Sequence, residues 1–565
     1  MVSGPLEEVT LFKIAPVNLP NGSLRCWTNT FKWEQRPAFD AISITWEEGP
    51  PDDTIWRDDD LAKAPGALVE CLKQLERDGR TDSFYWVCTI GYGDGHGGYR
   101  VDLPDIAAVF SAAENVICWL GPLLPGAFDS LPQLCTAHQR AVDLGTDMVA
   151  ALDQYQRKIA DISPSAWGTL DKLLSLRFFT RSWIAVEVIC SNKPVVYCGS
   201  LKVEWDDLCF ALRGCDLYAC PSRIKSNGLQ TLLSIDAARA YRMSTKPSPW
   251  PGVLVQYVLT ALTSPAVGAK DPMDRIRGAS SILRETHKMH RLRGTSQEGP
   301  TFKTFAVGLN AILRRPFTLS MTGGSGSQLA QTSWVPDWAT PRTRLTLDAP
   351  DARFSASPVE PYKFERTPWD RLDFTGLAAG RVAATAGYMP LRRHTDHFGA
   401  SDGNAFFLGQ WFDWAEDNTS RIRRHGEKDV LLQFAETIQA HGCGWKYAAA
   451  MPADRNLFRE RARQFLGFLE NEDADESYEI RLFYAACYPA HGRVFGITSH
   501  GCLCLLPRGA AAGDVVCIPH GARVPALLRV VGDCYHNLGE CYIHGMMHGE
   551  ADTLAGTTTR RFQIQ

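Results

Sequence analysis

The stretch Phe39-Asp-Ala-Ile-Ser-Ile-Thr-Trp46 alternates apolar residues with small or polar ones and then meets the loop Glu47–Pro51. This is the pattern of a β-strand that ends at a turn. Further along the chain, Phe84–Ile90 and Val116–Gly121 are short apolar runs of strand length. Apolar residues at helical spacing separate the three runs, first Leu68, Cys71, Leu72 and Leu75, then Ile106, Val109, Phe110 and Ala113. Strand and helix therefore alternate, which predicts an α/β arrangement with helices packed on a sheet.

The rest of the chain divides by its pattern into a helical middle and a β-rich end. We expect an α/β domain over residues 1–215, a helical region over 216–330 and a β-rich region over 331–565. Alternating apolar residues between turn residues indicate strands in the last region. The runs are Arg493–Thr498, Cys502–Leu505, Asp514–Ile518 and Ala526–Val531.

The composition is typical of a packed globular protein. Of 565 residues, 45% are hydrophobic and 22% are charged, which is too apolar for a disordered chain. Lys+Arg 59 against Asp+Glu 63 gives a net charge of −4, which argues against a nucleic-acid partner. We therefore expect the partners to be other proteins or a small molecule, and the oligomeric state stays open.

The cysteines and the first residues indicate the compartment. The 17 cysteines have no regular spacing, and several lie in apolar runs, which favours reduced, buried thiols. The start, MVSGPLEEV, lacks the pattern of a signal peptide. The longest uncharged stretch, Trp250–Ala269, contains Pro251 and Pro265 and is too polar for a spanning helix. We expect a cytoplasmic protein with no membrane span.

Several motifs in this order resemble the fungal heterokaryon-incompatibility (HET) domain proteins. The family's opening strand, "YxALSYxWG", is similar to Phe39–Trp46, and its "VxVWLG" strand is similar to Val116–Gly121. Its "WFxRxWxxQE" motif is similar to Phe179-Thr-Arg-Ser-Trp-Ile-Ala-Val-Glu187. Further matches are Asp271-Pro-Met-Asp-Arg275 for "DPRDK", Ser333–Trp338 for "SWVPDW", and the C-terminal Gly513–Ile518.

This resemblance implies a fold and a function. It implies a TIR-like N-terminal sheet flanked by helices, since the HET domain has been likened to the TIR fold, some of whose members cleave NAD. It also implies a role in fungal self/non-self recognition and cell death. The apolar frame of the motifs is kept, but their polar positions fall on Cys88, Gly91, Gly93 and Asp94, and Glu47 replaces a glycine. The polar lining of the site is thus replaced.

Glu187 is the most informative carboxylate, because Trp183–Ile189 around it is apolar. Burial there would raise its pKa and suit acid/base chemistry. The alternative, which we favour, is a buried glutamate paired with Arg181 or a backbone amide. Glu47 and Asp94 complete the set of candidate catalytic acids.

An aromatic pocket could surround these acids. Its expected lining is Trp46, Trp86, Cys88, His96, Arg181 and Trp183. Cys88 with His96 could form a nucleophile pair, although a core thiol fits the apolar run better. Gly93–Gly98 spells G-x-G-x-x-G, but the next strand ends at Trp119–Gly121 without the acid that binds a ribose, so a surface loop is favoured.

No cofactor or metal is expected. His536, His544 and His548 with Glu540 and Glu550 could suggest zinc, but the surroundings look like strands and do not predict four converging ligands. NAD enters only as a possible substrate. Three functions stay open: HET-type recognition or cell-death signalling, a family member adapted as a small-molecule enzyme of the cyclase or isomerase type in a biosynthetic pathway (secondary metabolism), and TIR-like NAD cleavage. Whether the chain is an enzyme is uncertain from its sequence.

Overall fold

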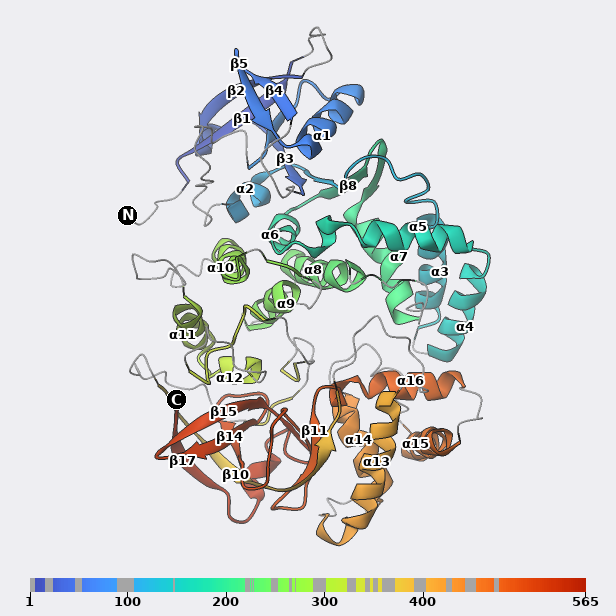
Figure 1. The fold of residues 1–565 in the computed structure, drawn as a ribbon, viewed down its shortest axis with the longest axis vertical. Coiled ribbons are helices and arrows are strands. Elements are labelled where there is room, and N and C mark those ends of the chain that lie inside the picture. Colours follow the sequence, from blue (N-terminus) through green and yellow to red (C-terminus); the bar gives the residue numbers. More distant parts are fainter. Residues whose placement is uncertain are drawn as a thin grey trace. The chain divides into compact units, whose positions relative to one another are not determined.

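The structure is a computed structural model and divides the chain into two compact units (Figure 1). The first comprises Met1–Pro249 and Tyr257–His290, and the second comprises Trp250–Gln256 and Arg291–Gln565. The described residues are 6–15, 24–45, 53–88, 106–145, 148–218, 224, 226, 228–244, 252–263, 267–269, 271–287, 301–322, 332–340, 346–348, 354–357, 371–390, 403–422, 429–442, 454–471 and 477–565. The boundaries of the three regions expected from the sequence, at residues 215 and 330, stay a prediction.

The first unit is built on one mixed sheet. Its described strands run in the order β5-β4-β2-β1-β6-β3-β7-β8-β9. In the centre β6, β3, β7 and β8 are parallel neighbours, whereas β1 and β9 join them antiparallel. The bounds are β1 (Glu8–Ile14), β2 (Arg25–Lys32), β3 (Phe39–Ile44), β4 (Asp53–Arg57), β5 (Asp60–Ala64), β6 (Phe84–Trp86), β7 (Val116–Trp119), β8 (Pro194–Cys198) and β9 (Leu201–Glu204).

Helices cover both faces of the central strands. The apolar side of α1 (Gly66–Arg77) packs on a cluster that includes Ile42, Tyr85 and Ile117. Successive strand residues point to opposite faces, so Trp86 faces away from α1. There it meets Phe110 of α2 (Ile106–Ala112) edge-on, with ring centroids 5.4 Å apart. The expected α/β arrangement of strands and helices is confirmed for this region.

The middle of the chain is helical, as expected. In the first unit, α2, α6 and α10 contact one another, and α8 packs on α6. The bounds are α3 (Leu131–Asp143), α4 (Met148–Ile159), α5 (Pro164–Leu174), α6 (Trp183–Ile189), α7 (Trp205–Leu217), α8 (Gly228–Met243), α9 (Gly252–Thr263), α10 (Met273–His287), α11 (Phe302–Leu313) and α12 (Thr318–Met321). No described helix is both long enough and apolar enough to cross a membrane.

The second unit contains a sheet that closes on itself. Its order is β13-β14-β15-β17-β10-β11-β12-β16, and β13 also pairs with β10. The 17-residue β10 makes this possible, because its first half lies between β17 and β13 and its second half pairs with β11. The bounds are β10 (Leu372–Tyr388), β11 (Val494–Thr498), β12 (Leu503–Leu506), β13 (Val515–Pro519), β14 (Ala526–Val531), β15 (Cys534–Glu540), β16 (Tyr542–Ile543) and β17 (Thr558–Ile564). All four strands expected from the apolar runs are present.

Four helices between β10 and β11 were not expected. They are α13 (Gly403–Asp417), α14 (Val430–Ile438), α15 (Arg455–Glu470) and α16 (Tyr478–Ala486). In α14 the signal was present, since its apolar residues recur at helical spacing opposite Gln433, Glu436 and Thr437, although the fold buries both sides of the helix. In α15 the signal was present, since Asp454 caps the helix and its buried residues recur at helical spacing. The C-terminal region is therefore a closed sheet with a helical layer.

Candidate functional site around Glu187

Glu187 lies on α6, and its carboxylate is held from two sides. Ser43 of β3 donates its hydroxyl to Oε2 of Glu187. Nη2 of Arg181 lies 3.1 Å from Oε1. Only 8% of Glu187 and 1% of Ser43 are exposed. Both carboxylate oxygens therefore have a protein donor, and Arg181 is the partner considered for Glu187 from the sequence.

The position of this cluster follows from the parallel strands. Ser43 lies near the carboxyl end of β3, opposite Cys118 of β7, on the face away from α1. Arg181 donates through Nη1 to the carbonyl of Ile44, the last residue of β3. Open α/β sheets bind ligands beyond the carboxyl ends of their strands. The cluster thus occupies the part of this sheet where a ligand site is expected.

The segment before α6 is fixed by main-chain bonds. Arg181 forms a parallel bridge with Gly268. Gly268 N–H donates to the carbonyl of Thr180 at 2.7 Å, and Ser182 N–H donates to the carbonyl of Gly268 at 3.1 Å. These bonds hold the backbone of Arg181, and therefore limit where its guanidinium can reach.

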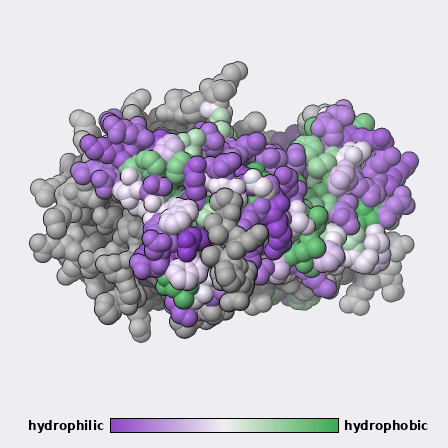
Figure 2. Space-filling model, turned by 90° about the horizontal axis from the view of Figure 1, so that it is seen from above, coloured by the Kyte–Doolittle hydropathy of each residue, from purple (hydrophilic) through white to green (hydrophobic). Residues whose placement is uncertain are grey.

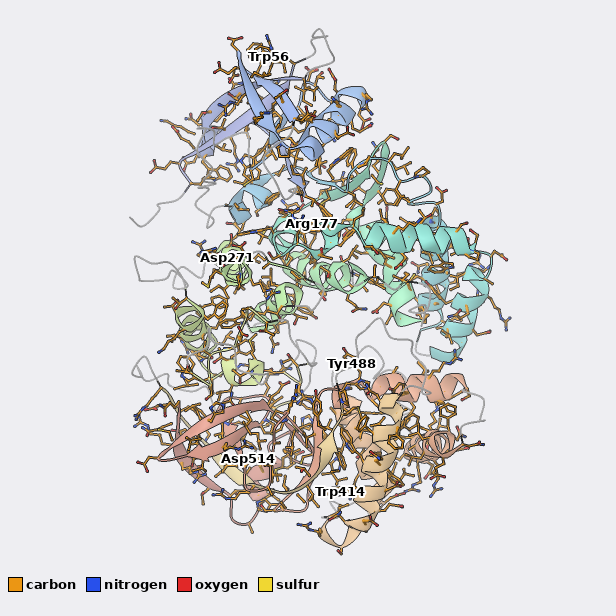
Figure 3. The ribbon with its side chains drawn as sticks, in the orientation of Figure 1. Trp56, Arg177, Asp271, Trp414, Tyr488 and Asp514 are labelled. Carbon is orange, nitrogen blue, oxygen red and sulfur yellow. The ribbon has the colours of Figure 1, made fainter. Side chains whose placement is uncertain are left out.

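Trp183 is held by the motif Asp271–Arg275 at the start of α10. Its indole Nε1 donates to Oδ2 of Asp274 at 3.3 Å. Arg277 joins Asp271 at 2.6 Å and Asp274 at 3.1 Å, which orders that turn (Figure 3 labels Asp271). Two motifs that are about 90 residues apart in the sequence are thus in direct contact, since the Trp183–Asp274 bond spans 91 positions.

Arginines from α8 hold the other end of α6. Arg239 donates to the carbonyls of Ser191 and Asn192, at 3.3 and 2.7 Å. Arg242 donates to those of Ile189 and Ser191, both at 3.2 Å. Cations at a helix C-terminus are favourable because they satisfy its last carbonyls and its dipole. The sequence analysis identified neither Arg239 and Arg242 nor Ser43. The available signal for the two arginines was their spacing of three positions in a helix whose apolar residues are buried.

Cys88 does not have the electrostatics of a nucleophile. Burial, and to a lesser extent the charge of Glu187, raise its pKa to about 12, while Arg181 acts in the opposite direction. The thiolate is the reactive form of cysteine, so Cys88 stays a neutral thiol near pH 7. The described cysteines are all free thiols.

The remaining predicted site residues are placed as follows. Trp86 is a buried core aromatic on Phe110. Trp46, Glu47, Asp94 and His96 lie outside the described residues. The structure therefore brings Arg181 and Glu187 together, puts Cys88 within electrostatic reach of both, and leaves the aromatic pocket as a prediction.

A second buried polar cluster lies in the second unit. Glu540, considered above as a metal ligand, pairs with Arg493 at 2.8 Å, and neither side chain is exposed. Glu540 also accepts the N–H groups of Leu347 and Asp348, at 2.7 and 3.2 Å. Nε2 of His544 lies 3.8 Å from Glu436. In the part of the chain that the structure describes, no three His, Cys, Asp or Glu side chains group so as to hold a metal ion.

One family model matches the chain. Residues 428–562 match the Het-6 beta-barrel domain, which indicates a relation to heterokaryon-incompatibility proteins for this segment. The segment includes α14 to α16 and most of the closed sheet, but β10 lies before it. No curated protein and no solved structure matches the chain.

Proposed function

We propose that this chain is a HET-related protein that acts in fungal self/non-self recognition or cell-death signalling through contacts with other proteins. The observation that carries the proposal is the match of residues 428–562 to the Het-6 beta-barrel domain. Two bonds that join three separate HET-like motifs, Ser43 to Glu187 and Trp183 to Asp274, support it. In this proposal the N-terminal sheet is TIR-like and the protein acts in the cytoplasm.

The contacts of Glu187 favour a structural role in a signalling protein over the role of an exposed catalytic acid. Both carboxylate oxygens accept bonds from Arg181 and Ser43, so the group holds α6 against the end of β3. Exposed apolar side chains offer surface for protein contacts. Leu61 of β5 is 60% exposed and Trp27 of β2 is 40% exposed. Figure 2 shows hydrophobic patches between hydrophilic ones on the visible face.

The test is induced expression of the full chain in a filamentous fungus, with growth and uptake of a vital dye as readouts. We expect growth arrest, a weaker response with Glu187→Gln, and the full response with Glu70→Gln. Glu70 is the matched control because it is an exposed glutamate on α1 of the same unit. Normal growth and normal cell fusion in all strains would contradict the proposal.

A second candidate is an enzyme that acts on a small molecule at the same place. The position of Ser43 and Glu187 near the carboxyl end of a parallel strand favours it. NAD cleavage is one form, and cyclase- or isomerase-type chemistry is another. Purified full chain is incubated with NAD and nicotinamide is followed by chromatography, with Glu187→Gln and Glu70→Gln alongside.

Nicotinamide release that is lost in Glu187→Gln but kept in Glu70→Gln would support NAD cleavage. If the unchanged chain releases no nicotinamide, NAD cleavage is discarded. The general enzyme candidate is tested by metabolite profiles of a deletion strain. If the deletion strain loses one compound but its cells fuse normally, the enzymatic proposal replaces the signalling proposal.

A further inference from the structure

Strands β1, β2, β4 and β5 carry aromatic and basic side chains on the face of the first sheet that points away from α1. The register places them there, since Trp56 of β4 lies opposite both Leu61 of β5 and Arg25 of β2. Trp27 follows Arg25 by two positions and lies opposite Lys13 of β1. Directly opposite residues share a face, and so do residues two positions apart in one strand. The other face belongs to the core cluster under α1, which includes Ile14, Cys26 and Ile55.

Arg25 is held between two indole rings. Its guanidinium carbon lies 5.3 Å from the ring centroid of Trp27 and 5.4 Å from that of Trp56 (Figure 3 labels Trp56). A guanidinium over an aromatic ring is attracted by the ring, and stacking fixes its plane. Trp27 is 40% exposed, and Leu61, which lies opposite Trp56, is 60% exposed. The fixed cation is therefore flanked by apolar surface that is open to solvent.

The charges of these four strands are divided between the two faces. On the side of Arg25 the described strands carry no acid, and their cations there are Lys13, Arg25 and Lys63. By the same alternation their acids lie on the side of α1, and these are Glu8, Asp53 and Asp60. Within the described chain none of the three cations has a carboxylate partner, and Nε of Arg25 is buried without a hydrogen-bond partner. Nζ of Lys13 lies 4.5 Å from the ring centroid of Phe84 instead.

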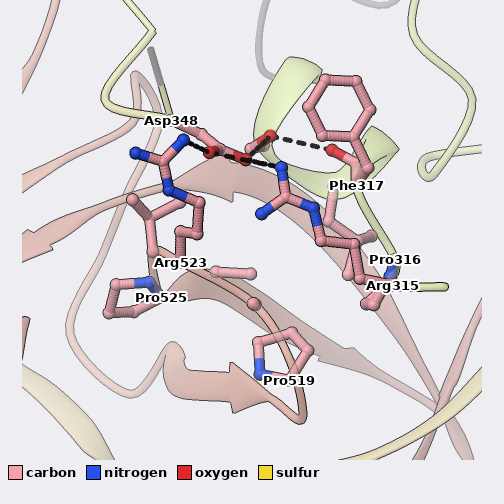
Figure 4. A pocket seen from close by; sticks show the side chains of 12 residues that line it. Arg315, Pro316, Phe317, Asp348, Pro519, Arg523 and Pro525 are labelled. Atoms are coloured by element: carbon pink, nitrogen blue, oxygen red, sulfur yellow. Dashed lines mark hydrogen bonds and ion pairs between the residues drawn. The ribbon is translucent and has the colours of Figure 1, made fainter. Parts of the chain in front are cut away.

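The buried cations of the second unit differ in this respect. Arg315 and Arg523 line a small cavity together with Asp348 and pair with it, at 3.1 and 3.4 Å (Figure 4). A cation that already contacts a carboxylate gains little from a second one, because its charge is matched and its donors are engaged. The three cations on the sheet of the first unit still have that capacity.

We propose that this face of the sheet binds an acidic segment of a partner protein that also carries apolar side chains. The inference rests on the proposed function, in which the chain acts through protein contacts, and it names the chemistry of the partner. A carboxylate can meet the fixed guanidinium of Arg25 with two parallel N–H···O bonds. Tryptophan and arginine are the side chains that most often dominate the binding energy of an interface. Leu61 adds apolar surface that such a segment covers.

The same observations argue against a nucleic acid at this face. Nucleic-acid binding draws most of its affinity from many phosphate contacts, whereas the strands supply three cations here. Bases stack on open aromatic faces, but the guanidinium of Arg25 lies over the rings of both Trp27 and Trp56. Single-stranded DNA and anionic vesicles are therefore the competing ligands in the test.

Fluorescence anisotropy of the purified full chain with a labelled peptide tests the inference. The probe is a short synthetic peptide of glutamate, tryptophan and glycine, beside the same peptide with glutamine in place of glutamate. We expect saturable binding of the glutamate peptide, and at least about tenfold weaker binding of the glutamine peptide. Arg25→Gln should weaken the binding of the glutamate peptide by about tenfold, because the two-bond contact to a carboxylate is lost.

Two further variants carry smaller expected effects. Lys63→Gln and Leu61→Ser should each weaken the binding by about threefold, because one removes an exposed charge and the other an exposed apolar contact. Lys32→Gln should leave it unchanged. It is the matched control because Lys32 is an exposed lysine of β2 on the side of α1, opposite Glu8.

No binding of the glutamate peptide, or equal binding by Arg25→Gln and the unchanged chain, overturns the inference. So does tighter binding of oligo-dT or of phosphatidylserine vesicles that is lost in Arg25→Gln, which would assign the face to a nucleic acid or a membrane. If Arg25→Gln does not fold, Lys63→Gln and Leu61→Ser decide, since both side chains are exposed. The growth assay is independent of these results. Peptide binding without growth arrest would contradict the signalling proposal alone, and growth arrest without peptide binding would overturn this inference alone.

Discussion

The two units each contain a buried Arg–Glu pair, but the surroundings of the pairs differ. Arg493 and Glu540 are fully enclosed, and Glu540 also accepts two backbone N–H groups. Arg181 and Glu187 keep 12% and 10% side-chain exposure, and the second donor to Glu187 is a hydroxyl, which can rotate. The first pair therefore holds the chain around the closed sheet, whereas the second lies where an open sheet can meet a ligand or partner.

The largest effect is expected from Glu540→Gln. It leaves the enclosed Arg493 without its counter-charge and should lower the free energy of unfolding of the second unit by about 3–5 kcal/mol. Denaturant unfolding followed by tryptophan fluorescence measures it. The double variant Arg493→Met/Glu540→Leu should recover part of the loss. A loss below about 1 kcal/mol for the single variant would mean that the pair is solvated.

The next largest effect is expected in the rate at which the Cys88 thiol is alkylated. With a pKa of about 12, its thiolate fraction at pH 8 is far below that of a free thiol, so alkylation should be at least about a hundredfold slower. Iodoacetamide labelling with mass spectrometry measures the rate, and the denatured chain is the reference. Equal rates in the two states would return Cys88 to the candidate nucleophiles.

The raised pKa of Cys88 also predicts the direction in which the stability of the first unit changes with pH. Because the folded-state pKa of Cys88 is raised, the folded state keeps a proton that the unfolded chain loses above its ordinary pKa of about 9. Stability from this group is fully present below pH 9 and falls as the pH rises toward 12. Cys26 and Cys190, both with pKa values raised to about 12 by burial, act in the same sense. Unfolding of the first unit between pH 8 and 11 checks the sign; rising stability would contradict it.

Glu187→Gln should cost less than Glu540→Gln. The amide keeps the shape but weakens the bond to Arg181, and the partial exposure of the pair limits the loss to about 1–3 kcal/mol. Unfolding of Glu187→Gln beside Glu70→Gln, measured under the same conditions, gives the difference. If Glu187→Gln costs as much as Glu540→Gln, the two pairs play the same structural role.

The smallest effect tests how the second sheet closes. A Cβ at Gly376 of β10 would lie 2.8 Å from the carbonyl oxygen of Ile518 on β13. Gly376→Ala should therefore destabilise the second unit by about 1–2 kcal/mol, because two paired backbones must separate. Gly467→Ala on α15 is the control, since its Cβ meets nothing within 4 Å and alanine favours a helix. Equal stability of the two variants would argue against the β10–β13 pairing.

Much of the first unit could be predicted from local patterns. The strand at Phe39–Ile44 and the helix over Gly66–Arg77 have the expected apolar spacing. In the second unit, the four apolar runs found in the sequence correspond to β11 to β14. The helix α14 was missed although its apolar residues recur at helical spacing; that its polar stripe is buried as well is decided by the fold. Arg181 could be suggested as the partner of Glu187 because the two residues are close in the sequence.

The amino-acid sequence was enough for the alternation of strands and helices, the apolar setting of Glu187 and its short-range arginine partner, because these depend on spacings of a few residues. The fold was needed to place Ser43 on Glu187, a contact across 144 positions, and to bring β10 between β17 and β13. It was also needed to place Arg315, Asp348 and Arg523 around one cavity. Such contacts join residues that are distant in the chain, and no local period encodes which of them meet.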